Sequence, residues 1–302
     1  FQTAHPKVTI NYSPDGSGAG RTAFRDGGAA FAGSDRALSD DQMSGRFASC
    51  AADTPPLNLP IYVAPIAIVF NLEGVSELYL SAALIAMIFR GEINNWNDPA
   101  IAELNSDLPL PDLAITPVHR SDNSGTTENF TATLAEVVPE IWTDAASGDW
   151  PSSIRGEAAQ GTSGVVAAVQ NGVGTIGYAD ESGIPETMTV AKYSKTGIGG
   201  YVGPEAVAAA ALVEASSRAN QHDANDWALK LNRNAVGYPF VLVSYAIVCQ
   251  EYQDPATGEL VNAYMSYVVS DAGQQAAVPH AGNAPLPGSL ATGVQAAAAS
   301  IR

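Results

Sequence analysis

Two long apolar runs constrain the fold of this chain more than any other feature. The stretches "NLPIYVAPIAIVF" at 58–70 and "YPFVLVSYAIVC" at 238–249 are its longest strand-like segments, and they lie far apart in the sequence. No linker rich in Pro, Gly or Ser separates two consecutive domains. We therefore expect both strands to cross between interleaved domains, one formed by residues 1–64 plus 241–302 and the other by the insert 65–240.

Short strand patterns alternate with helical patterns along the rest of the chain. The predicted strands "KVTINY" at 7–12, "AITPVHR" at 114–120 and "GTIGYAD" at 174–180 each precede or follow a helical segment. This alternation is typical of an α/β fold, in which helices cover both faces of a sheet. In such folds ligands bind beyond the carboxyl ends of strands. The Ala-rich stretch 204–216 predicts a surface helix that begins at Pro204.

The charge balance excludes several classes of partner. The chain has 14 basic and 31 acidic residues, a formal net charge of -17. Nucleic acid and anionic membrane surfaces require basic patches, so we expect neither as a partner. A bound anion would have to be held by local geometry, because the overall field repels it. No apolar run reaches the roughly 18 residues of a membrane span.

The cysteines and histidines indicate no metal site. Four scattered histidines form no zinc-binding pattern, and we expect neither a metal nor a cofactor. Cys50 and Cys249 permit one disulfide, which would close a very long loop, and the alternative is two unpaired buried thiols.

Two clusters in the first domain follow strand patterns and carry candidate binding groups. In "GSGAG", Gly16, Ser17 and Gly18 would let the backbone approach a ligand and aim N–H groups at it, although a tight turn is the alternative. In "AGSDRALSD", Asp35 follows a predicted strand. It is either a helix N-cap or an acceptor that requires a protonated anion. Downstream of Asp35, Ser39 with Gln42 is typical of a capping box.

The stretch "HRSDNSGTT" at 119–127 is the third cluster. Arg120 offers a planar fork of donors suited to an oxyanion, and Asp122 could hold its guanidinium in place. Ser124, Gly125 and Thr126 then begin a helix and could present hydroxyl and N–H groups. The alternative is a capped turn with a surface ion pair. A fourth stretch, "QGTSG", predicts another helix start at Thr162 and Ser163, with capping favoured over a pocket-lining role.

Taken in order, these motifs resemble the substrate-binding proteins of phosphate-specific ABC transporters, in their actinobacterial form. The motifs are "GSGAG", "AGSDRALSD", "WNDPAIAELN", "HRSDNSGTT" and "GTIGYAD", and the resemblance covers nearly the whole chain. It implies an α/β fold of the type II periplasmic-binding-protein class, with two lobes joined by two crossing strands and the ligand in the cleft. It also implies high-affinity binding of inorganic phosphate for uptake by the permease subunits of the transporter.

The resemblance assigns roles to particular residues. Ser17 and Asp35 would bind phosphate from the first lobe, and Arg120 with the 124–126 segment (Ser124, Gly125 and Thr126) from the second. Asp122, Gly16 and Gly18 would support them. Family members also open with a glycine-rich loop and a helix. By this resemblance Phe1 falls near the end of the expected helix. Either the loop and most of the helix precede residue 1, or the protein lacks this part of the pocket. We expect an exported monomer, anchored by lipid at the outer face of the cell membrane.

Two other functions remain as alternatives. The same scaffold could bind or sense another oxyanion. A phosphate-ester hydrolase would need Ser17 or Ser124 as nucleophile and a base beside it. His119 is next to Arg120, but strand alternation points it to the opposite face. We therefore expect a binding protein and not an enzyme.

Overall fold

The chain divides into two compact units in the computed structural model, which describes all residues except 220–222, 236 and 282–283. Unit 1 comprises Phe1–Val63, Val213–Leu231 and Val243–Arg302. Unit 2 comprises Ala64–Leu212 and Asn232–Leu242. Each unit has its own buried core and is described by itself.

Residues 213–231 pack with unit 1, whereas the sequence interpretation placed them in the insert 65–240. The buried carboxylate of Asp226 explains this difference. Its Oδ1 accepts hydrogen bonds from the backbone N–H and the side-chain amide of Asn58, at 2.8 and 2.9 Å. Asn58 in turn accepts a bond from the N–H of Leu38. Buried polar contacts therefore attach residues 213–231 to unit 1. A pattern of apolar residues in the sequence does not predict such contacts.

The two longest strands are β2 (Pro56–Asn71) and β11 (Val241–Cys249), at the positions of the two apolar runs. Nearly all their residues are buried, which explains why both runs lack the polar alternation of a half-exposed strand. Both strands begin in the residues of one unit and end in those of the other. None of the helices in the described residues has the length and apolar character of a membrane span.

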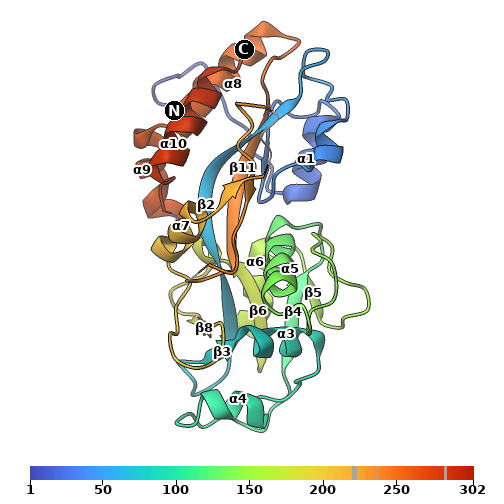
Figure 1. Cartoon of the computed structure of the whole chain (residues 1–302), viewed down its shortest axis with the longest axis vertical. Helices are drawn as coiled ribbons and strands as arrows, with labels where there is room; N and C mark the ends of the chain where they lie inside the picture. Colours follow the sequence, from blue (N-terminus) through green and yellow to red (C-terminus); the bar gives the residue numbers. More distant parts are fainter. Residues whose placement is uncertain (220–222, 236, 282–283) are drawn as a thin grey trace. The chain divides into compact units, whose positions relative to one another are not determined.

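Unit 1 combines a short strand with helices from both ends of the chain (Figure 1). Strand β1 pairs antiparallel with β11 through Ala32↔Ile247 and Ser34↔Tyr245. The elements that belong to unit 1 are α1 (Ser17–Arg25), β1 (Ala32–Ser34), α2 (Asp40–Met43), β9 (Ser217–Arg218), β10 (Leu229–Lys230), α8 (Pro255–Val268), α9 (Asp271–Ala281) and α10 (Gly288–Ala299). The predicted capping box is confirmed at α2, where Ser39 and Gln42 bond to each other's backbone.

Unit 2 is built on a mixed sheet. The elements within it are β3 (Tyr79–Ser81), α3 (Ala82–Arg90), α4 (Pro99–Leu104), β4 (Thr116–Arg120), α5 (Gly125–Val137), β5 (Glu157–Ala159), α6 (Gly161–Asn171), β6 (Thr175–Asp180), the 3-10 turn Glu181–Gly183, β7 (Thr189–Val190) and β8 (Lys192–Ser194). Helix α7 (Ala206–Glu214) runs across the boundary into unit 1. Strand β6 pairs antiparallel with β2 and parallel with β4, and β4 pairs parallel with β5.

One hydrophobic core cluster of unit 2 lies between this sheet and α6. Ala67, Val69 and Val118 of the sheet pack against Val165 and Val169 of the helix. At Gly177 of β6 a Cβ atom would lie 2.8 Å from Val169 Cγ2. The second glycine of the "GTIGY" motif is therefore required by close helix packing. This packing fixes the carboxyl end of β4, where Arg120 lies.

Three local predictions are wrong. Residues 7–12 form no strand, and Tyr12 is largely exposed, because no neighbouring strand pairs with them. The Ala-rich helix begins at Ala206 rather than Pro204, and it buries Ala209 and Leu212. Helix α6 begins at Gly161 after Gln160, with no side-chain cap. Thr162 and Ser163 therefore lie inside its first turn.

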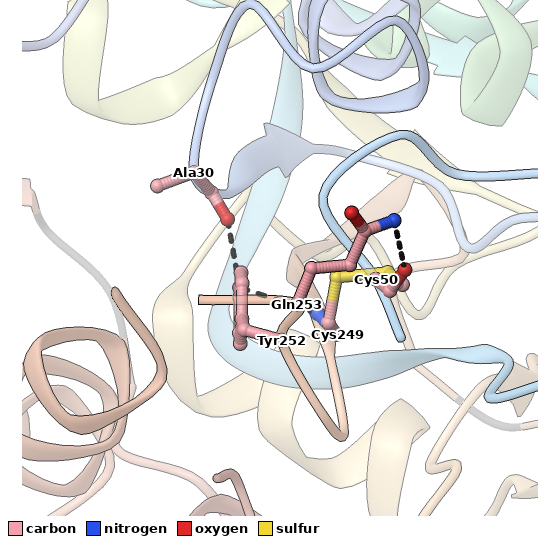
Figure 2. Close-up of a disulfide and its surroundings, with 5 residues drawn as sticks. All are labelled: Ala30, Cys50, Cys249, Tyr252 and Gln253. Atoms are coloured by element: carbon pink, nitrogen blue, oxygen red, sulfur yellow. Dashed lines mark hydrogen bonds between the residues drawn. A yellow bond between two sulfur atoms is a disulfide. The ribbon is translucent and has the colours of Figure 1, made fainter. Parts of the chain in front are cut away.

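Cys50 and Cys249 form a disulfide within unit 1 (Figure 2). Neighbouring side chains fix the backbone on both sides. Tyr252 accepts a hydrogen bond from the N–H of Cys249 and donates one to the carbonyl of Ala30. Gln253 donates to the carbonyl of Cys50. The bridge joins residues 199 positions apart, and all of unit 2 is inserted between them.

Loss of this disulfide should destabilise the protein strongly. A cross-link that closes so long a loop removes much of the entropy of the unfolded chain, so we expect the Cys50→Ser/Cys249→Ser variant to lose about 2–5 kcal/mol. Urea unfolding followed by circular dichroism measures this loss. Wild-type protein treated with a reductant should match the variant. Equal midpoints for oxidised and reduced protein would contradict the expectation.

Candidate functional site

The candidate residues of unit 1 gather where α1 and β1 meet. The Oγ of Ser17 accepts a hydrogen bond from the N–H of Asp35 at 3.1 Å. Asp35 directly follows β1, and its Oδ1 accepts a hydrogen bond from the hydroxyl of Ser244 on β11. Two residues separated by 18 positions are thus brought together, and Asp35 does not cap a helix.

The glycines of "GSGAG" have distinct backbone roles. Gly16 precedes α1 with φ 89°, a conformation that side chains disfavour, and contributes no side-chain cap. Because the first N–H groups of a helix have no acceptor within it, those of Ser17 and Gly18 can point to a ligand. At Gly20 a Cβ atom would lie 3.1 Å from the carbonyl oxygen of Gly33, so this glycine lets α1 approach β1.

In unit 2 the guanidinium of Arg120 is held by a two-point ion pair. Its Nε donates to Asp122 Oδ1 at 2.7 Å, and its Nη2 donates to Oδ2 of the same carboxylate. Arg120 is buried and Asp122 is mostly buried, with exposed side-chain fractions of 7% and 11%. The N–H of Gly161, the first residue of α6, also donates to Asp122 Oδ1 at 3.0 Å. The "QGTSG" stretch thus braces the ion pair.

Electrostatics keep Asp122 ionised. Burial alone would raise the pKa of this carboxyl group. The hydrogen bonds from Arg120 and Gly161, together with the positive charge of Arg120, outweigh that effect and hold the pKa below its usual value. The guanidinium fork is therefore oriented before any ligand binds, with its charge partly offset.

Helix α5 begins immediately after this pair. Ser124 is its N-cap, 1% exposed, and its Oγ accepts a bond from the N–H of Thr127 at 3.2 Å. The N–H groups of Gly125 and Thr126 follow, and helix geometry offers them no acceptor within the helix. Arg120, Asp122 and the 124–126 segment are thus brought together at the junction of β4 and α5.

Tyr178 braces the same junction, although sequence reasoning gave it no role. Its hydroxyl lies 2.7 Å from Thr127 Oγ1, and its ring stacks on Phe130 at 4.3 Å between centroids. Burial raises its pKa well above the usual value, so it remains neutral. Ser244 was missed as well. The signal for both was a polar atom within an otherwise apolar strand.

A groove of about 680 Å³ lies beside Arg120 in unit 2, lined also by Trp150 and the exposed Arg155. The ring of His119 stacks on Trp150 with centroids 4.7 Å apart, and its Nδ1 lies 2.9 Å from the carbonyl oxygen of Arg120. Burial lowers the pKa of His119. In the described part of the chain, no three or more His, Cys, Asp or Glu side chains are grouped as metal ligands would be.

Comparison with known proteins identifies the family. Residues 1–272 match the model of a PBP superfamily domain. The chain is 35% identical to phosphate-binding protein PstS3 of Mycobacterium bovis over 280 residues. The aligned region covers 91% of this chain and 74% of that protein.

Solved structures share the fold. A phosphate-binding protein from Stenotrophomonas maltophilia superposes with a TM-score of 0.77 at 22% identity, over 96% of this chain and 87% of that one. A putative phosphate ABC transporter substrate-binding protein with bound phosphate, from Clostridium perfringens, gives a TM-score of 0.64 at 18% identity, over 93% and 89%. The predicted α/β periplasmic-binding-protein fold is thus confirmed. The chain belongs to the PBP superfamily and, within it, to the family of the phosphate-binding proteins PstS.

Proposed function

We propose that the protein binds inorganic phosphate and delivers it to the permease subunits of an ABC transporter. The observation that carries this proposal is the buried, oriented guanidinium of Arg120 directly before the N-terminus of α5. A planar fork and a helix N-terminus at one point suit a tetrahedral oxyanion. The family relationship supports the same substrate, since the relatives are named for phosphate binding.

A divalent anion needs donors for every oxygen, because leaving water without them costs tens of kcal/mol. In the proposed site Arg120, the hydroxyl of Ser124 and the N–H groups of Gly125 and Thr126 supply donors from unit 2. Ser17 and the N-terminus of α1, with Gly16 and Gly18 in support, supply donors from unit 1.

Asp35 would give the site its selectivity. At neutral pH phosphate retains a proton that it can donate to a carboxylate. Sulfate has no such proton, so its negative charge would face that of Asp35 without a bridging hydrogen. A site built around an acceptor rejects an analogue that lacks the matching hydrogen. Ser244 donates to Asp35 and orients its carboxylate.

The contacts of the candidate nucleophiles favour binding without catalysis. Ser124 Oγ caps α5 and Ser17 Oγ accepts the N–H of Asp35, while His119 is stacked on Trp150. We further propose a monomer that works outside the cytoplasm with a lipid anchor. The disulfide supports an oxidising compartment.

The selectivity of the site can be tested at Asp35. By calorimetric titration we expect wild-type protein to prefer phosphate over sulfate by about 10⁴ or more. Asp35→Asn should weaken phosphate binding and reduce this preference, because an amide cannot accept the proton as a carboxylate does. Asp41→Asn removes the same charge from an exposed position in unit 1 and serves as the control. Comparable wild-type affinities for the two anions would refute a phosphate-selective site.

Arg120 can be tested against a neighbouring arginine. Arg120→Lys keeps the charge but loses the planar fork and its two-point contact, so phosphate affinity should fall by about 10- to 100-fold. Arg155→Lys changes an exposed residue that lines the same groove, and its affinity should stay near that of wild type. Equal affinities of the two variants, measured by titration calorimetry, would place the anion elsewhere.

The stability contributed by Asp122 should depend on pH. Because its folded pKa is depressed, its contribution is complete above the unfolded value of about 3.9 and is lost as pH falls through the folded value. Urea unfolding should show the largest difference between wild type and Asp122→Asn near pH 7 and a smaller one below about pH 4. Asp107→Asn, at an exposed position, should show no such dependence. A difference that is the same at both pH values would argue against the depressed pKa.

A further inference from the structure

Arg233 is a buried cation that the proposed binding site does not use. Its side chain is 5% exposed and lies in unit 2, just before β11. Its Nη1 donates to Thr133 Oγ1 at 2.8 Å and to the carbonyl oxygens of Pro239 and Val241 at 3.0 and 3.1 Å. Its Nη2 donates to Asn129 Oδ1 at 2.5 Å. One guanidinium thus joins α5 to the start of β11.

The contact with Asn129 leads directly to the start of α5. Asn129 and Thr133 lie one turn apart on the same face of the helix. The amide nitrogen of Asn129 donates to the carbonyl oxygen of Gly125 at 2.9 Å. The Asn129 side chain therefore accepts from Arg233 on one side and holds the first helical residue on the other. Thr133 is also bonded to Arg233, but its hydroxyl donates to the backbone of Asn129 and Pro239 and does not reach Gly125.

The hydrogen bonds of Arg233 depend on the exact positions of its acceptors. Burial of a guanidinium removes its hydration, and this loss is offset only if each N–H of the planar fork meets a well-placed acceptor. Oxygens of α5 and of the segment leading into β11 supply them, so the helix is fixed to the strand that continues into the residues of unit 1. Helix ends fray readily, and a bond from Asn129 to the Gly125 carbonyl opposes this at the first turn.

We propose that Arg233 and Asn129 are positioning residues that set the N-terminus of α5 for anion binding. This inference rests on the proposed function, since it assumes that the N–H groups of Gly125 and Thr126 contact the anion. Arg233 itself does not touch the anion. It acts through Asn129, and Thr133 shares the clamp without the link to Gly125.

Three variants separate positioning from general stability. Asn129→Leu keeps the side-chain size but cuts the link between Arg233 and Gly125. Arg233→Lys keeps the charge but loses the fork. Thr133→Val is the matched control. It removes another hydrogen bond to Arg233, from a side chain that is buried like that of Asn129, without touching the bond to Gly125. Affinity for inorganic phosphate is measured by titration calorimetry, stability by urea unfolding, and the amide signals of Gly125 and Thr126 by NMR.

We expect wild type to bind phosphate with shifts of both amide signals. Asn129→Leu and Arg233→Lys should bind about tenfold more weakly, as do sites whose supporting contacts are removed. Their two amide signals should be displaced already without phosphate. Thr133→Val should keep wild-type affinity and amide positions while losing stability.

The outcomes discriminate between the two proposals. If wild-type protein does not bind phosphate, the proposed function fails. If wild type binds and the folded Asn129→Leu or Arg233→Lys variants bind within about twofold of it, the positioning role is wrong. Equal losses in Thr133→Val and Asn129→Leu would also overturn it, because the effect would then follow stability. If Asn129→Leu does not fold, the comparison of Arg233→Lys with Thr133→Val decides.

Discussion

The two-point ion pair between Arg120 and Asp122 organises the candidate site of unit 2. An arginine on a strand end would ordinarily extend into water, where its side chain samples many rotamers. Here burial and the carboxylate hold it in one orientation. The cost of ordering the guanidinium is thus met during folding and not during binding, which is the physical basis of a preorganised site.

The N-terminus of α5 is fixed by contacts from several elements of unit 2. Tyr178 of β6 bonds Thr127, the carbonyl of Gly148 accepts the N–H of Ser124, and Asn129 bonds Gly125. The contacted residues, Ser124, Gly125 and Thr127, are the N-cap and part of the first turn of α5. A helix terminus held in this way can direct its N–H groups at a ligand, because fraying no longer changes their orientation.

Local geometry also resolves an electrostatic conflict. A net charge of -17 repels anions at long range. Salt screens that field within roughly 10 Å, whereas contacts between buried groups are screened far less. Arg120 and Arg233 are buried cations within unit 2, and the helix terminus adds partial positive charge. A protein with a negative net charge can therefore bind an anion at this site through short-range contacts.

The sequence by itself determined the fold class, the two long buried strands and the order of the motifs. These follow from local patterns: continuous apolar runs, alternating strand and helix signals, and Gly, Ser or Asp at strand ends. The pairing of Arg120 with Asp122 could also be anticipated, because the two residues lie only two positions apart in the sequence. The capping box at Ser39 was readable for the same reason.

Only the tertiary structure decided the contacts between distant residues. It brought Ser17 and Ser244 to Asp35, Gly161 to Asp122, and Arg233 to Asn129. It also paired Cys50 with Cys249 and excluded a strand at residues 7–12. The reason is physical. A polar group in a buried segment must find a hydrogen-bond partner, but its identity depends on which elements pack together, and no local pattern specifies that.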